Sequence, residues 1–286
     1  MRRADGFYQE NQFGNALTEC EAALALDPAL AEGHHNRGVA LYFLERFDES
    51  QSALERALYI RPDFAEALFN LGLTLLILHS SDEEALAVLE KATETKPSLA
   101  SAHLIRARLL MNANRNQEAL TSLRAAIEAN RDLADAYAAT AQVLERLHQF
   151  EEALAHYDKA IQLVPDWADA HYNRGIVLGQ LDRHMEAAAS FEQALTLNAT
   201  DSGTQYNWAV AVRRIRPYAD ALRIADQAIR RWPSFDLAYY LRGRMLMNMG
   251  HYEESLKALE QAIALRPDFQ EYRDGWRMVN TLLGKQ

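Results

Sequence analysis

The chain has very little cysteine and no obvious targeting segment. Cys20 is the single cysteine among 286 residues, so no intrachain disulfide can form and a disulfide-stapled scaffold is excluded. The first residues, MRRADGFYQENQ, hold two arginines with no apolar run behind them. We therefore predict neither a secretory signal nor a membrane helix there, and we expect a cytoplasmic location.

Positive charge and catalytic motifs are also scarce. The 30 basic residues are outnumbered by 40 acidic ones, and the net charge of -10 repels the phosphates that supply most non-specific affinity for nucleic acid. The metal-binding patterns HExxH and CxxC, a glycine-rich phosphate loop and a GxSxG elbow are all absent from the sequence. We predict a protein that is not an enzyme and that binds no cofactor, metal ion, nucleic acid or membrane.

Proline is sparse, but it is placed regularly. Six of the seven prolines follow one another at intervals of 34, 35, 68, 68 and 34 residues: Pro28, Pro62, Pro97, Pro165, Pro233 and Pro267. The period is therefore 34 residues, with one extra residue in one copy. Because proline lacks the amide hydrogen that a helix interior requires, each of these prolines is predicted to end a helix.

Small residues recur with the same period at two positions. The first set is Ala16, Ser50, Ala85, Ala119, Ala153, Ala187, Ala221 and Ser255, and the second is Ala23, Ala57, Ala92, Ala126, Ala160, Ala194, Ala228 and Ala262. Small side chains allow two helices to approach at the short end of the usual range of about 8–10 Å. Between these positions apolar residues recur at steps of three and four, so each repeat is predicted to be a helix-turn-helix unit.

Repetition of this kind predicts one continuous array, because each repeat adds a layer to a single core. We predict one domain over residues 1–286, made of a truncated repeat at 1–30, full repeats at 31–64, 65–99, 100–133, 134–167, 168–201, 202–235 and 236–269, and a capping helix at 270–286. The extra residue of the 35-residue copy is placed near residues 79–82, in the turn between its helices. Since the array starts partway through a repeat, the sequence leaves open whether residues upstream of Met1, including a targeting signal, are missing.

Two copies, AEALFNLGLTLL (65–76) and ADAHYNRGIVLG (168–179), resemble the tetratricopeptide repeat family in its bacterial form. The family's first-helix glycine stands at Gly38, Gly72, Gly175 and Gly243, whereas its early tryptophan is absent throughout. The resemblance covers essentially the whole chain. It implies an all-α, right-handed alpha-alpha superhelix of about seven full repeats that serves as a non-catalytic protein-binding scaffold.

Histidine and cysteine are interpreted as structural residues. His34, His103 and His171 occupy equivalent positions two repeats apart, which is roughly 20 Å at ordinary helix spacing, so one metal ion cannot bridge them. Cys20 stands at a position that leucine or phenylalanine fills in other copies, and it is predicted to be buried.

A recurring arginine is also interpreted as structural. It stands at one position in alternate copies, as Arg37, Arg106, Arg174 and Arg242. Arginine can lay its stem over apolar surface while its head reaches an acidic neighbour, and we predict that arrangement here.

In the family, ligands contact the first helices on the concave side. Transferring those contact positions to this chain gives an early apolar part: Val39, Tyr42, Phe43, Phe69, Leu73, Leu76, Ile77, Leu104 and Met111. It also gives a late aromatic and basic part: Tyr172, Tyr206, Tyr240, Arg213, Arg214 and Arg244.

Repeat 202–235 reverses the sign of the charge. Its six arginines face only two aspartates, which leaves +4 within an acidic chain. Arg213 and Arg214 are predicted to face the groove, where guanidinium groups can bind carboxylates in pairs of hydrogen bonds, so the partner is expected to carry an acidic segment. The alternative is that these arginines are solvated surface charges.

Asparagine occupies the sixth position of four repeats, as Asn36, Asn70, Asn173 and Asn207. Side-chain amides both donate and accept, so a spaced row of them can hold the main chain of an extended peptide. The row is similar to the asparagine ladder of O-linked N-acetylglucosamine transferases, although other residues interrupt it. The lysine-and-asparagine carboxylate clamp of chaperone-binding members is not reproduced, so binding of a chaperone's acidic tail is not expected.

Three hypotheses of function result. The first is a non-catalytic protein–protein interaction scaffold that binds an extended peptide or partner protein in the concave groove. The second is the substrate-recognition arm of a glycosyltransferase-like protein, which rests on the asparagine row. The third is a self-associating assembly factor, because exposed apolar patches often mark interfaces.

Overall fold

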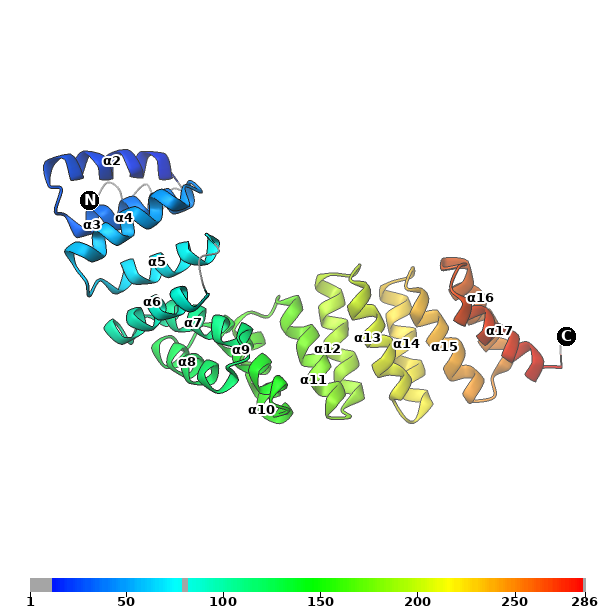
Figure 1. Ribbon diagram of the computed structural model, residues 1–286. Coiled ribbons are helices and arrows are strands. Elements are labelled where there is room, and N and C mark those ends of the chain that lie inside the picture. The colour runs from blue at the N-terminus through cyan, green and yellow to red at the C-terminus, as the bar shows by residue number, and fades with distance from the viewer. Residues whose placement is uncertain (1–11, 79–81, 285–286) are drawn as a thin grey trace. The chain divides into compact units, whose positions relative to one another are not determined.

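The computed structural model describes residues 12–78 and 82–284, and over these residues the chain forms α-helices and no strands (Figure 1). The chain divides into two compact units, Met1–Val143 and Leu144–Gln286. The all-α helical-repeat solenoid predicted from the sequence is confirmed. Residues 1–11 of the truncated repeat, and 79–81 around the predicted insertion, lie outside the described residues.

The helices alternate between a first helix of 13 residues and a second helix of 14 residues. The first unit holds α2 (Phe13–Leu26), α3 (Ala31–Phe43), α4 (Phe47–Ile60), α5 (Ala65–Ile77), α6 (Asp82–Thr95), α7 (Ala100–Asn112), α8 (Asn116–Ala129) and most of α9 (Ala134–Arg146). The second unit holds α10 (Phe150–Leu163), α11 (Ala168–Gln180), α12 (His184–Leu197), α13 (Ser202–Arg214), α14 (Tyr218–Arg231), α15 (Asp236–Asn248), α16 (Tyr252–Leu265) and α17 (Gln270–Leu282). Each first helix begins at the residue where the 34-residue period starts a repeat.

Small side chains set the spacing within each hairpin. All eight residues of the earlier small set, from Ala16 to Ser255, are fully buried. Two serines of that set also donate to the facing helix, because Ser50 Oγ bonds the Gly38 carbonyl at 2.8 Å and Ser255 Oγ bonds the Gly243 carbonyl at 2.7 Å. Close approach of the two helices is therefore built into the sequence period.

Glycine serves the same close approach on the first helix. A Cβ built on Gly175 of α11 would lie only 2.6 Å from the Phe191 ring of α12, whereas a Cβ on Gly179 of the same helix meets no atom within 4 Å. The first glycine makes room for a large neighbour, and the second faces open space.

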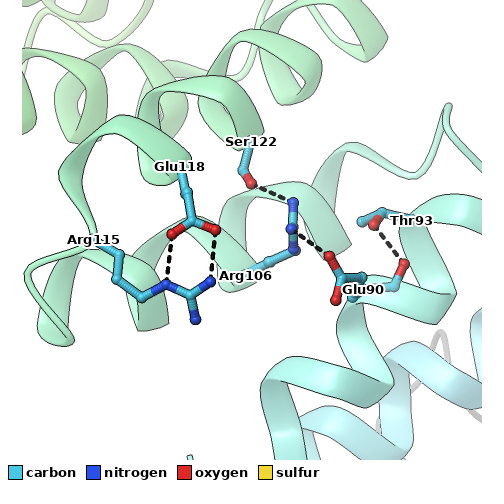
Figure 2. A network of polar contacts seen from close by, with 6 residues as sticks. All are labelled: Glu90, Thr93, Arg106, Arg115, Glu118 and Ser122. Atoms are coloured by element: carbon cyan, nitrogen blue, oxygen red, sulfur yellow. Dashed lines mark hydrogen bonds and ion pairs between the residues drawn. The ribbon is translucent and has the colours of Figure 1, made fainter. Parts of the chain in front are cut away.

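The recurring arginine ties consecutive repeats together, as Figure 2 shows for Arg106. Its guanidinium donates to Glu90 Oε1 of the preceding repeat at 2.8 Å and to Ser122 Oγ of its own repeat at 2.8 Å. Arg37, Arg174 and Arg242 likewise each reach the acidic residue sixteen positions earlier in the chain: Glu21, Asp158 and Asp226. The predicted structural role of this arginine is confirmed.

Tryptophan takes over the same link in two copies. Trp208 Nε1 donates to Glu192 Oε1 at 3.2 Å, and Trp276 Nε1 donates to Glu260 Oε1 at 3.2 Å, again across sixteen residues. Cys20 is fully buried, as predicted.

The two glycines of α11 give a paired prediction. Gly175→Ala forces the added methyl against the Phe191 ring and should lower the free energy of unfolding by about 1–3 kcal/mol. Gly179→Ala meets open space and should raise it by up to about 1 kcal/mol, because alanine favours the helix. Urea unfolding measures both, and equal effects of the two substitutions would refute this explanation of the glycine position.

The inter-repeat arginine gives a second pair of variants, both visible in Figure 2. Arg106→Ala removes a side chain that is only 18% exposed together with its bond to Ser122, and should cost about 1–2 kcal/mol of stability. Arg115→Ala breaks only an ion pair with Glu118 within one helix turn, where the arginine is 46% exposed, and should change stability little. Thermal unfolding of the two variants compares them, and a larger loss in Arg115→Ala would contradict the assignment.

Candidate functional site

The turn between α13 and α14 differs from the other turns within hairpins. In five other repeats, one residue of this turn has a positive φ: Glu45, Asn114, His148, Asp182 and Gly250. The next residue's amide then bonds a carbonyl near the end of the first helix, which closes the helix in the usual way.

Pro217 occupies the position of that donor in repeat 202–235, and proline has no amide hydrogen to give. The chain instead leaves α13 in extended conformation at Ile215. As a result, α13 and α14 contact each other less extensively than the helices of neighbouring hairpins.

Four arginines gather around this altered turn. They line an open pocket of about 700 Å³ together with one histidine, one tyrosine, one methionine and one asparagine. The full lining is His184, Arg213, Arg214, Arg216, Tyr218, Arg244, Met245 and Asn248. Among the residues that the structure describes, no acidic side chain lines the pocket, so four positive charges share it.

Two of the four arginines are held by neighbours. Arg216 donates to the Arg213 carbonyl at 2.9 Å and to the Ile215 carbonyl at 2.8 Å, and its guanidinium lies 4.2 Å from the centroid of the Tyr218 ring. Arg244 donates to the Tyr240 hydroxyl at 2.9 Å. These two guanidinium groups are fixed in place before any ligand arrives.

Arg213 and Arg214 are different. Both side chains are exposed at the end of α13, and within residues 12–78 and 82–284 their guanidinium groups make no hydrogen bond or ion pair. Like charges held together repel one another, and the repulsion is relieved when an anion enters. The arrangement can therefore bind a carboxylate or another anion with two fixed and two adaptable donors.

The remaining predicted residues of the second unit lie on α11, α13 and α15 and do not line this pocket. Asn207 Nδ2 donates to the Tyr172 hydroxyl at 2.9 Å, and Tyr240 packs on Tyr272 with ring centroids 4.9 Å apart. Tyr206 is 64% exposed on α13, and Asn173 is half-buried on α11. The structure thus brings Arg213, Arg214 and Arg244 together and sets Tyr240 beside them.

In the first unit, His35 links the two predicted asparagines. Its Nδ1 lies 3.0 Å from Asn36 Oδ1, and its Nε2 lies 2.8 Å from Asn70 Nδ2. These contacts fit a neutral ring that donates through Nδ1 and accepts at Nε2. The amides of Asn36 and Asn70 therefore already use part of their hydrogen-bonding capacity within the chain.

The predicted apolar surface of the first unit is partly wrong. Leu104 and Met111 are buried in the core, because their aliphatic side chains are covered by packed helices. Phe69 is half-buried against the core, whereas Phe43 is 54% exposed and stacks on Phe13 at 4.4 Å. The exposed part of this surface is smaller than the sequence predicts.

Five residues that line the arginine pocket were not predicted as site residues: His184, Arg216, Tyr218, Met245 and Asn248. The family's contact positions do not include His184, Arg216 or Tyr218. Pro217 was the available signal, because a proline inside the turn of a single repeat indicates that the local geometry differs there.

The titration of two buried histidines is shifted. Burial lowers the pKa of the His35 ring, and the hydrogen bond to Asn36 opposes that shift. Burial also lowers the pKa of His103, against the raising effect of its hydrogen bond to the Pro97 carbonyl. Both shifts favour the neutral form of the ring.

Stacked helical hairpins with exposed first helices and a charged pocket define a helical-repeat binding scaffold. Family models described as "TPR repeat" and "Tetratricopeptide repeat" match residues 4–45, 35–100, 100–133, 146–182, 168–201 and 236–269. The chain belongs to the tetratricopeptide repeat family, and the matches support a protein–protein interaction scaffold.

Solved structures share the fold at low sequence identity. PilW, a type IV pilus biogenesis factor, is 21% identical with a TM-score of 0.62, and the match covers 72% of this chain and 94% of PilW. A tetratricopeptide repeat protein from Parabacteroides merdae is 15% identical with a TM-score of 0.56, covering 87% of this chain and 98% of that protein. MamA from Desulfovibrio magneticus is 22% identical with a TM-score of 0.54, covering 60% of this chain and 97% of MamA.

No curated protein matches the sequence significantly. Among the helices of the described part of the chain, none is both long enough and apolar enough to cross a membrane.

The buried ring of His35 predicts a pH dependence. Since its pKa is lower in the folded state than in the unfolded state, its contribution to stability is complete above about pH 6.5 and is lost as the pH falls. His35→Gln removes this titration, so its unfolding midpoint should fall less than the wild-type midpoint between about pH 7.5 and pH 5.5. His103→Gln should flatten the profile in the same sense, and unchanged profiles in both variants would contradict the assignment.

Proposed function

We propose that the chain is a non-catalytic scaffold that binds an extended acidic segment of a partner protein. The arginine pocket of the second unit is the proposed docking place. The single observation that supports this proposal is that Arg213, Arg214, Arg216 and Arg244 line one pocket with no acidic residue among its lining.

The chemistry of arginine favours a carboxylate partner. The planar guanidinium group matches a carboxylate with two parallel hydrogen bonds, and such charge-assisted bonds are about twice as strong as neutral ones. Arg213 and Arg214 are exposed and adaptable, whereas Arg216 and Arg244 are pre-positioned, which reduces the ordering cost on binding.

The overall negative charge does not forbid an acidic partner. At physiological ionic strength the Debye length is about 8 Å, so a bound carboxylate senses mainly the charges around the pocket. The net charge of -10 belongs to the whole chain, while the four arginines are within direct reach.

The hypothesis of a substrate-recognition arm of a glycosyltransferase-like protein, which rests on the asparagine row, stays a prediction. In the asparagine row, Asn36, Asn70 and Asn207 already use part of their hydrogen-bonding capacity within the chain. Self-association through the exposed Phe43 surface and the cytoplasmic location likewise remain predictions from the sequence.

The proposal predicts charge-dependent binding of a simple probe. A fluorescently labelled peptide of alternating glutamate and serine should bind the wild-type chain at least about tenfold more tightly than the same peptide with glutamine in place of glutamate. Arg213→Glu combined with Arg214→Glu should abolish that preference, as measured by fluorescence anisotropy.

The matched control is Arg223→Glu combined with Arg230→Glu. It makes the same change of charge in the same repeat at two exposed arginines of α14 that do not line the pocket. It should keep the preference for the glutamate peptide. Equal loss of binding in both double variants, at unchanged unfolding temperature, would mean that binding depends on the total surface charge and not on the pocket. That result would refute the proposal.

A further inference from the structure

A second, smaller cleft opens directly beside the arginine pocket. Its volume is about 220 Å³, and its walls include Ile176 and Gly179 of α11, Phe191 of α12 and Val210 of α13. The two cavities adjoin, because His184 and Arg214 line both of them.

The cleft exists because glycine stands at Gly179. A Cβ built there meets no atom within 4 Å, so the space above this part of α11 is empty. At Gly175, one helical turn earlier, the Phe191 ring packs against the glycine where a side chain would stand. The same ring forms one wall of the cleft. Helices α11, α12 and α13 thus leave a recess with apolar walls on one part and polar side chains on the other, where a further side chain could have packed.

The size of the recess suits one apolar side chain. A cavity of about 150 Å³ lined by apolar residues is enough to hold a benzene molecule. The recess is larger than that and is open to solvent. A leucine, isoleucine, methionine or phenylalanine side chain would therefore fit.

Polar groups stand at the edge of the recess. Asn207 lines it, and one of its amide hydrogens is donated to the Tyr172 hydroxyl at 2.9 Å. An amide carries a second hydrogen and an accepting oxygen, which can serve the main chain of a bound segment. This residue is also the one member of the predicted asparagine row that lies in either cavity.

We infer that the partner segment combines acidic residues with a bulky apolar side chain one or two positions away. The apolar side chain occupies the recess, and the neighbouring carboxylates bind the arginines. The separation follows from the shared residues, because side chains two apart on an extended segment lie roughly 7 Å from each other on one face. This inference rests on the proposed function and adds an apolar residue to the acidic residues of the recognised segment.

Three peptides separate the two halves. Each is the glutamate–serine peptide with one central glutamate replaced by leucine, by alanine or by serine, so that the substituted side chain lies two positions from a glutamate on the same face of an extended segment. The leucine peptide should bind the wild-type chain about tenfold more tightly than the alanine peptide, because leucine removes more apolar surface from water.

Gly179→Leu fills the recess from within and should erase the advantage of leucine over alanine while leaving the binding of the unchanged acidic peptide within about twofold. The matched control is Gly14→Leu, a helix glycine of α2 in the first unit whose built Cβ meets no atom of the described residues within 4 Å and which lines neither cavity. This control should keep the leucine preference.

The outcomes distinguish the two proposals. If the unchanged acidic peptide binds but leucine, alanine and serine bind equally, the inference about the recess is overturned and the proposed function stands. If none of the acidic peptides binds better than its glutamine counterpart, the proposed function itself fails. If Gly179→Leu retains the full leucine preference, the apolar side chain binds elsewhere and the inference is wrong.

Discussion

The structure depends on the close approach of two helices within each hairpin. Fully buried alanine or serine stands on the second helix in every repeat, from Ala16 to Ser255, and glycine on the first helix makes room for a leucine or phenylalanine of the second in four repeats: Gly38, Gly72, Gly175 and Gly243. Because this contact recurs every 34 residues, it sets the orientation of each hairpin. The arginine and tryptophan links across sixteen residues then join the repeats that carry them to the preceding repeat.

In a regular array, one irregular residue changes the packing of a single hairpin. Pro217 removes one amide hydrogen from one turn. Helices α13 and α14 contact each other less extensively than the two helices of neighbouring hairpins. The space and the exposed end of α13 that result are occupied by Arg213, Arg214 and Arg216, with Arg244 reaching in from α15. The candidate site is thus a local departure from the packing rule that builds the rest of the chain.

The sequence could predict the repeat because the packing rule is local. Prolines, small residues and apolar residues at steps of three and four are each required by one helix or one pair of helices. The period, the helix starts and the roles of Cys20 and Arg106 could therefore be predicted from the sequence. The site could be predicted only in part. Arg213, Arg214 and Arg244 follow from the family's contact positions, whereas Arg216 and Tyr218 belong to the altered turn and His184 lines the pocket from the start of α12.

Burial on the first helices was the other weak point. Apolar residues at equivalent positions of successive repeats can be covered to different degrees, as the half-buried Leu76 and the buried Met111 show near the end of the first helix. How far each of them is covered depends on the size of the side chains on the neighbouring helices. Sequence position alone cannot supply that information, because covering a side chain takes contributions from more than one repeat.

The most direct test of the central claim observes the arginine side chains themselves. In a nuclear magnetic resonance titration with the glutamate–serine peptide, the Nε–Hε signals of Arg213, Arg214 and Arg244 should shift and saturate together. The signals of the structural arginines Arg106 and Arg174 should stay in place, since their guanidinium groups are already bound to Glu90 and Asp158. Shifts spread evenly over the exposed arginines of both units, or absent from Arg213 and Arg214, would contradict the account.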